Sequence, residues 1–126
     1  MSQRLTLIFA AVFGFSAVAI GAFGAHGLED RVSPARLAVF EVGARYQMVH
    51  ALALFALAGF VERLGSAGKV AVAAFVVGIL IFAGSLYLLV LLDQGWLGAV
   101  TPIGGVSLMV GWASVFVGAW RFKAEG

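Results

Sequence analysis

The sequence contains no cysteine, which excludes disulfide bonds, cysteine-containing metal sites and thiol chemistry. Other metal ligands are also scarce, because the chain has only two histidines and no carboxylate pair that converges on them. Such a ligand set is too small for a typical transition-metal site. We therefore expect no metal site.

Charged residues are also few: 11% of the 126 residues are charged, whereas 63% are hydrophobic. Four runs carry no charged side chain at all, at residues 5–26, 46–61, 70–92 and 94–120. Because a helix needs about 20 apolar residues to cross a bilayer, these runs predict four spans. The predicted fold class is all-α, an integral membrane four-helix bundle that forms a single transmembrane domain over residues 1–126.

The chain has only two prolines, and each follows a hydroxyl residue, at Ser33-Pro34 and Thr101-Pro102. A serine can cap the first amides of a helix, and proline fits the first helical position. The first pair predicts one long helix from Pro34, or a surface helix that bends near Gly43 into the second span. Either form supplies the length that the short run 46–61 lacks. The second pair predicts a last helix over about 102–120.

The basic residues predict the orientation in the membrane. Apart from those in the first loop, the basic residues are Arg4, Arg63, Lys69, Arg121 and Lys123. The loop before Trp96 has no basic residue. Since basic loops stay in the cytoplasm, both termini are predicted to be cytoplasmic. The first loop runs against this pattern, because Arg31, Arg36 and Arg45 would lie outside, accompanied by three acidic residues. The net charge of +2 is small and the basic residues are dispersed, so nucleic acid is not an expected partner. Membrane lipids are expected partners.

Small residues recur at helical spacing in two of the runs. They are Ala10, Gly14, Ala17, Gly21 and Gly24 in the first run, and Gly104, Ser107, Gly111, Ser114 and Gly118 in the last. Small residues allow helix backbones to approach closely within a membrane. We interpret both stripes as packing faces within one chain; a seam between copies of a homo-oligomer is the alternative.

Polar residues within the apolar runs are the only local indication of a site. With cytoplasmic termini, they gather toward the outer leaflet; they are His26, Arg45, Tyr46, Gln47, His50, Ser85, Tyr87 and Thr101. Gln47 and His50 share a helix face, and Glu41 can pair with Arg45 one turn away. The cluster is a candidate site for a proton path, a quinone or a lipid headgroup. Alternatively, these residues only hydrogen-bond one another and fix the helices.

Sequence patterns of known catalytic sites are missing. The glycine-rich phrases at 21–24 and 104–105 lie in apolar helix rather than after a strand, so they do not predict a phosphate loop. No nucleophile stands in the context of a Ser-His-Asp or Cys-His arrangement. We expect no enzymatic activity, and the sequence leaves any cofactor unknown.

Four phrases carry a resemblance to a known family: GAFGAHGL at 21–28, ARYQMVHA at 44–51, GSLY at 84–87 and LGAVTPIGG at 97–105. They resemble the YgdD/YwdK-like family of small bacterial inner-membrane proteins, to which a mitochondrial transmembrane protein is also similar. The resemblance covers nearly the whole chain. It implies a multipass four-helix protein of the bacterial inner (plasma) membrane and gives no reaction, substrate or site.

Two classes of function follow from these observations. The first is a non-enzymatic accessory or structural protein, which associates with a larger membrane complex or binds a lipid or a quinone. The second is a small oligomeric transporter or channel, because four spans seldom enclose a solute path alone. The absence of a carboxylate within the apolar runs disfavours ion coupling. We favour the first class.

Overall fold

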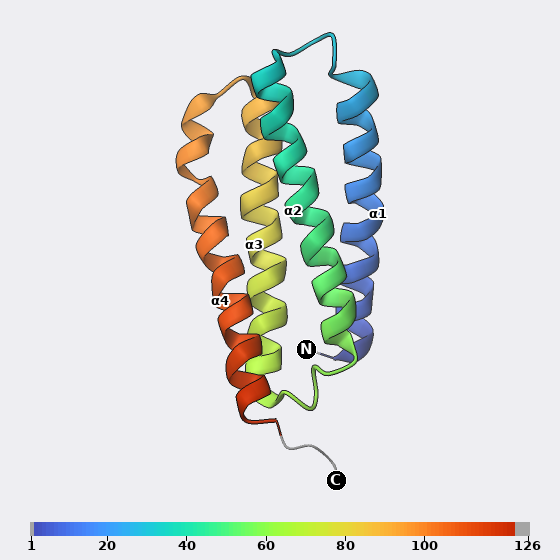
Figure 1. The fold of residues 1–126 in the computed structure, drawn as a ribbon, viewed down its shortest axis with the longest axis vertical. Coiled ribbons are helices and arrows are strands. Elements are labelled where there is room, and N and C mark those ends of the chain that lie inside the picture. The colour runs from blue at the N-terminus through green and yellow to red at the C-terminus, as the bar shows by residue number, and fades with distance from the viewer. Residues whose placement is uncertain (1, 123–126) are drawn as a thin grey trace.

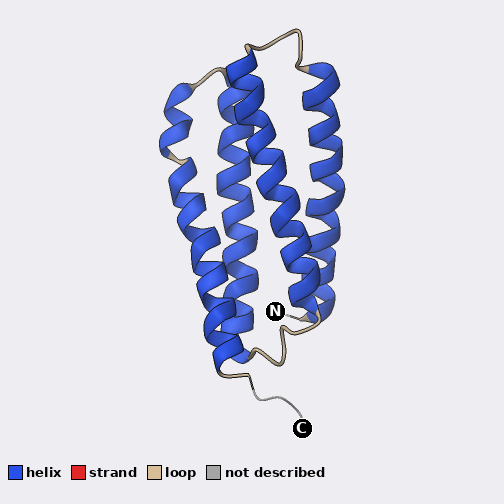
Figure 2. Ribbon diagram, in the orientation of Figure 1, coloured by secondary structure: helices blue, strands red, loops and turns tan. Residues whose placement is uncertain are grey.

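The computed structural model describes residues 2–122, which form long helices joined by short loops (Figure 2). The elements are α1 (Gln3–Gly27), α2 (Pro34–Ala58), α3 (Gly65–Leu92), the short 3-10 helix η1 (Gly95–Ala99) and α4 (Thr101–Trp120). No strand occurs among these described residues, which confirms the predicted all-α class. The long helices alternate in direction, so α1 begins and α4 ends at the same end of the molecule (Figure 1).

Serine caps begin the first two long helices. The Oγ of Ser2 accepts a hydrogen bond from the amide of Leu5 at 3.1 Å, and the Oγ of Ser33 accepts one from the amide of Arg36 at 3.1 Å. Pro34 occupies the first position of α2, where its missing N–H leaves no bond unmade. The helix start predicted at Ser33-Pro34 is confirmed, and α4 begins at Thr101 as its proline predicts.

The second helix is continuous from Pro34 to Ala58. A separate surface helix that bends near Gly43 is therefore not formed, and that alternative was wrong. Gly43 is instead a point of close packing, because a Cβ added there would lie 2.8 Å from the ring of Tyr87 on α3. Tyr87 of α3 therefore packs closely against α2 at this position.

The third helix ends at a left-handed residue. Asp93 has φ 52°, and its amide donates to the carbonyl oxygen of Leu89, which satisfies one of the last free carbonyls of α3. The carboxylate of Asp93 pairs with the guanidinium of Arg36 at 3.4 Å, and this is the one ion pair within residues 2–122. Glu41 and Arg45, whose spacing would allow a pair, do not form one.

The helices stand in a row in chain order, as Figure 1 shows. The most extensive packing is between α3 and α4, followed by α1 with α2 and α2 with α3. The first and last helices have no comparable contact, so they lie at opposite ends of the row. This open arrangement leaves α2 and α4 on either side of α3.

Two apolar clusters hold the row together. The larger one joins α1, α2, α3 and α4 and includes Phe13, Leu54, Phe75 and Leu108. The smaller one lies where the first loop meets α2 and α3, and consists of Leu28, Phe40, Leu89 and Val90. Together they extend the packing along most of the helix length.

The outer faces of the row are also apolar. Phe15 on α1 is 81% exposed, and Met109 on α4 is 71% exposed. The helical segments Gln3–Gly27, Gly65–Leu92 and Gly95–Trp120 are long and apolar enough to cross a membrane. The second helix does not meet that criterion, since Arg36, Glu41 and Arg45 lie in its first half.

Candidate functional site

The polar residues predicted to form one cluster lie in three separate hydrogen-bonded groups. Gln47 with Tyr87 makes the first, His50 the second, and Ser85 with Thr101 the third. Gln47, His50 and Ser85 are each no more than 5% exposed. Among residues 2–122, no buried side-chain nitrogen or oxygen lacks a partner. The groups therefore satisfy their own hydrogen bonds.

Gln47 connects three helices. Its Nε2 donates to the carbonyl oxygen of Phe13 at 2.9 Å and to the Oγ of Ser16 at 2.7 Å, both on α1. Its Oε1 accepts a bond of 2.7 Å from the hydroxyl of Tyr87 on α3. Both hydrogens of the Gln47 side-chain amide are used. The hydroxyl of Ser16 in turn donates a hydrogen bond of 2.8 Å to the carbonyl oxygen of Val12. In an apolar setting such a satisfied amide ties helices together.

His50 connects α2 to α4. Its Nε2 accepts a hydrogen bond of 3.0 Å from the indole N–H of Trp112. The ring hydrogen is therefore on Nδ1, from which it donates to the carbonyl oxygen of Tyr46 at 2.8 Å. The imidazole also packs against Phe75, with ring centroids 5.4 Å apart. This group bridges two helices that are otherwise separated by α3.

Ser85 and Thr101 form the third group, near the turn between α3 and α4. Their hydroxyl oxygens are 2.6 Å apart. Ser85 can also donate to the carbonyl oxygen of Phe82 at 2.9 Å. The pair fastens the start of α4 to α3.

The remaining predicted residues do not join these groups through their side chains. His26 and Arg45 are exposed, and neither has a side-chain hydrogen bond to another member within the described chain. Tyr46 is 43% exposed and stacks beside His50, with ring centroids 6.1 Å apart. The prediction of a single cluster was wrong in this respect, because depth along a helix does not fix the side that a residue faces.

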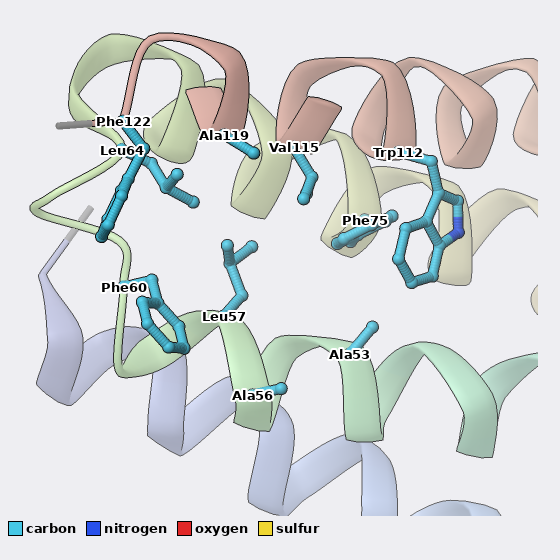
Figure 3. Close-up of a pocket in the computed structure, with 10 residues that line it drawn as sticks. All are labelled: Ala53, Ala56, Leu57, Phe60, Leu64, Phe75, Trp112, Val115, Ala119 and Phe122. Carbon is cyan, nitrogen blue, oxygen red and sulfur yellow. The ribbon is translucent and has the colours of Figure 1, made fainter. Parts of the chain in front are cut away.

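An apolar groove lies between α2 and α4, over α3. It encloses about 370 Å³ and is lined by Ala53, Ala56, Leu57, Phe60, Leu64, Phe75, Trp112, Val115, Ala119 and Phe122. Figure 3 shows Leu57 and Ala53 facing Val115 and Ala119 across the opening. Phe60 and Phe122 lie at one end of the groove and Trp112 at the other (Figure 3).

The two ends of the groove differ in chemistry. At the Phe122 end, the guanidinium carbon of Arg63 lies 4.5 Å from the centroid of the Phe122 ring. At the other end, the indole N–H of Trp112 is already bonded to His50. The groove therefore combines a hydrocarbon lining with a cation at the end where the chain termini lie.

Comparisons with known proteins give the chain its family. A family model described as "Protein of unknown function (DUF423)" matches residues 20–105. The chain is 42% identical over 127 residues to the UPF0382 inner membrane protein YgdD of Escherichia coli (strain K12), covering 100% of this chain and 97% of that protein. It is 39% identical over 122 residues to the UPF0382 membrane protein YwdK of Bacillus subtilis (strain 168), covering 95% of this chain and 99% of that protein.

The chain belongs to the DUF423 family. The resemblance drawn from its four phrases is thereby confirmed. No solved structure matches the chain. With its apolar helices, this DUF423 chain is a membrane protein whose family has no characterised role.

The DUF423 match includes most of the side chains in the three hydrogen-bonded groups but leaves out two of them. It spans Gln47, His50, Tyr87 and Thr101, whereas Ser16 lies before residue 20 and Trp112 lies beyond residue 105. The hydrogen bond from Trp112 to His50 was not predicted from the sequence. A buried or half-buried indole N–H usually finds an acceptor, and this rule was the only available signal.

The small residues of this DUF423 protein mostly lie at helix contacts. A Cβ added to Gly111 would meet the ring of Phe75 at 2.5 Å, and one added to Gly118 would meet Leu64 and Ala67 at 3.1–3.2 Å. At Gly104 it would collide with the backbone of Phe82. On α1, Gly14 faces Ala51 at 3.9 Å.

Gly21 differs from the other glycines that the sequence marked. A Cβ added there would meet nothing within 4 Å. This residue shares the helical spacing of the α1 stripe but does not lie at a close approach to α2. The predicted packing role does not apply to it.

Proposed function

We propose that this protein is a four-span, non-enzymatic accessory protein of the bacterial inner membrane that binds a phospholipid. The apolar groove carries the proposal. The groove accommodates a hydrocarbon chain, and Arg63 stands at its end where a phosphate group would lie. The inner membrane location is supported by the relative from Escherichia coli, which is named an inner membrane protein.

The packing of α2 supports a fourth span. Gly14 of α1 faces Ala51, and Gly43 lies against Tyr87 of α3, so α2 follows both neighbours along its length. If α1 and α3 cross the bilayer, α2 must lie in the same apolar layer. Its first-half charges then lie on a helix whose Gln47 and His50 side chains are hydrogen-bonded to other helices.

The distribution of basic residues supports cytoplasmic termini. Arg4, Arg63, Lys69 and Arg121 belong to the end of the row that holds both chain ends. Lys123 lies outside the described residues. The opposite end carries a mixture of charges, namely Glu29, Asp30, Arg31, Arg36 and Asp93. The positive-inside rule places the first end in the cytoplasm.

A phospholipid fits the groove better than a quinone or a transported solute does. A quinone held by hydrogen bonds needs a donor inside the groove, and the indole N–H of Trp112 is already bonded to His50. A transporter or channel, the alternative, would need further copies to enclose a path, because α1 and α4 do not pack together. Four of the side chains that the sequence offered as a ligand site have hydrogen-bond partners within the protein, which favours a structural role for them; they are Gln47, His50, Ser85 and Tyr87.

Native mass spectrometry of the purified protein tests the lipid proposal. Ala119→Phe places a large side chain in the groove, whereas Ala113→Phe enlarges an exposed alanine of the same helix that does not line it. We expect the parent and Ala113→Phe to retain a phospholipid that Ala119→Phe loses. Equal retention by the three proteins, or a quinone as the retained molecule, would contradict the proposal.

A further inference from the structure

One face of α2 carries charges at a depth where its neighbours carry none. Ala38, Glu41, Arg45, Val49 and Leu52 recur every three or four residues, and all five are exposed. They therefore form one stripe along the helix, here called the α2 outer stripe. Neither Glu41 nor Arg45 is in an ion pair within the described chain.

Arg45 lies in the middle part of α2 and not at the end of the row. Arg36 and Asp93 form the ion pair that marks the end of the row, and Arg45 follows Arg36 by nine positions, about 13.5 Å of helix. Half the hydrocarbon thickness of a bilayer is about 15 Å. Gly43, two positions before Arg45, lies on the packed side of α2 beside Tyr87. Tyr87 is in a stretch of α3 that carries no charged residue.

A charged side chain exposed at such depth is unfavourable against lipid, and charges within spans usually pair. The stripe is complementary to itself, since it carries one negative and one positive side chain a single turn apart. In a parallel pair of identical helices, Glu41 of each copy can reach Arg45 of the other. Ion pairs between residues about one turn apart in height are the usual arrangement at parallel helix pairs.

We propose that the α2 outer stripe is the interface of a two-fold homodimer, held by reciprocal ion pairs between Glu41 of one copy and Arg45 of the other. The occupant is a second copy of this chain because a two-fold interface brings the same patch together from both sides. Ala38, Val49 and Leu52 supply the apolar contact above and below the charges. None of the five residues of the α2 outer stripe lines the proposed lipid groove.

Because the chain has no cysteine of its own, a disulfide can form only at a cysteine that is introduced. Val49→Cys reports on the stripe, and Val77→Cys on α3 is a matched control, because the two valines are 49% and 46% exposed. In oxidised membranes, we expect Val49→Cys to give a crosslinked dimer and Val77→Cys to give little. Equal crosslinking at both positions, or a Val49→Cys adduct with a protein of another mass, overturns the proposal.

Charge reversal then distinguishes ion pairs between two copies from an ion pair between Glu41 and Arg45 of the same helix. In the Val49→Cys background, Glu41→Arg leaves two positive charges on the stripe and Arg45→Glu leaves two negative ones. Either variant alone should lower the crosslinked fraction about tenfold, because like charges then face one another. Coexpression of the two variants should restore crosslinking between them.

The coexpression experiment is also a control for misfolding of the two variants. Two variants that had lost their fold would not regain a specific disulfide when mixed. Unchanged crosslinking in the single variants would mean that the charges pair within one helix or face lipid, and the proposal would be wrong. Loss in the single variants without recovery in the mixture would also overturn it.

Discussion

Gln47 and His50 lie one helical turn apart on α2, and both are buried, yet their hydrogen bonds lead to different helices. Gln47 reaches α1 and α3, whereas His50 reaches α4 through Trp112. Both side chains thus act as connectors in an apolar environment, where hydrophobic association between helices is weak. A connector of this kind contributes to specificity because its partners lose their bonds when it is removed.

The variant Gln47→Leu should lower the free energy of unfolding by about 1–3 kcal/mol, since the buried hydroxyl of Tyr87 loses its acceptor. Reversible denaturation in detergent and SDS measures this change. Adding Tyr87→Phe to Gln47→Leu should cost less than the sum of the two single changes, because both remove one shared bond. Strict additivity would show that the two residues do not interact.

Sequence reasoning identified most of these residues but not their grouping. The three-residue spacing correctly placed Gln47 and His50 on one helix face, and the structure shows that both are buried. Arg45 belongs to the same phrase, but two positions on a helix correspond to about 200° of rotation, so it faces outward. The bond from Trp112 to His50 joins residues 62 positions apart, and no local pattern indicates such a contact.

At the scale of the helices, the capping residues and uncharged runs predicted where the elements begin. Ser33 and Pro34 start α2, and α4 runs from Thr101 to Trp120. Which helices pack against each other could not be predicted in the same way. The stripes of small residues show which helix faces allow a close approach, but not which helix packs against them. On α4 the glycines meet α3, which is the most extensive helix contact.

Two glycines of similar sequence context should respond differently to the same change. Gly104→Ala should lower the free energy of unfolding by about 1–3 kcal/mol, because the new Cβ collides with the backbone of Phe82, which cannot move aside as a flexible side chain can. Gly21→Ala should leave it unchanged or raise it by up to about 1 kcal/mol, since alanine favours the helix and meets open space. Denaturation of the two variants under identical conditions compares them directly. A larger loss from Gly21→Ala would mean that this face of α1 is covered.

At the scale of the whole molecule, the row of helices explains why the chain offers a groove and a free α2 face at once. A closed bundle would cover one or both, whereas here α4 contacts α3 and leaves a space beside α2. The sequence predicted the number of long helices but not this openness, because apolar composition is the same for a face that meets lipid and a face that meets another helix. The proposed lipid and the proposed second copy each cover one of these surfaces.

The account depends on α2 crossing the membrane despite its charged first half. Cysteine labelling in intact cells tests this directly, because the native chain has no cysteine. Asp30→Cys and Ser66→Cys lie beyond opposite ends of α2, and Gln94→Cys lies beyond the far end of α3; all three positions are exposed. An impermeant maleimide should label positions 30 and 94 from outside, and position 66 only after the membrane is opened. Labelling of positions 30 and 66 from the same side would show that α2 does not span the membrane and would contradict the account.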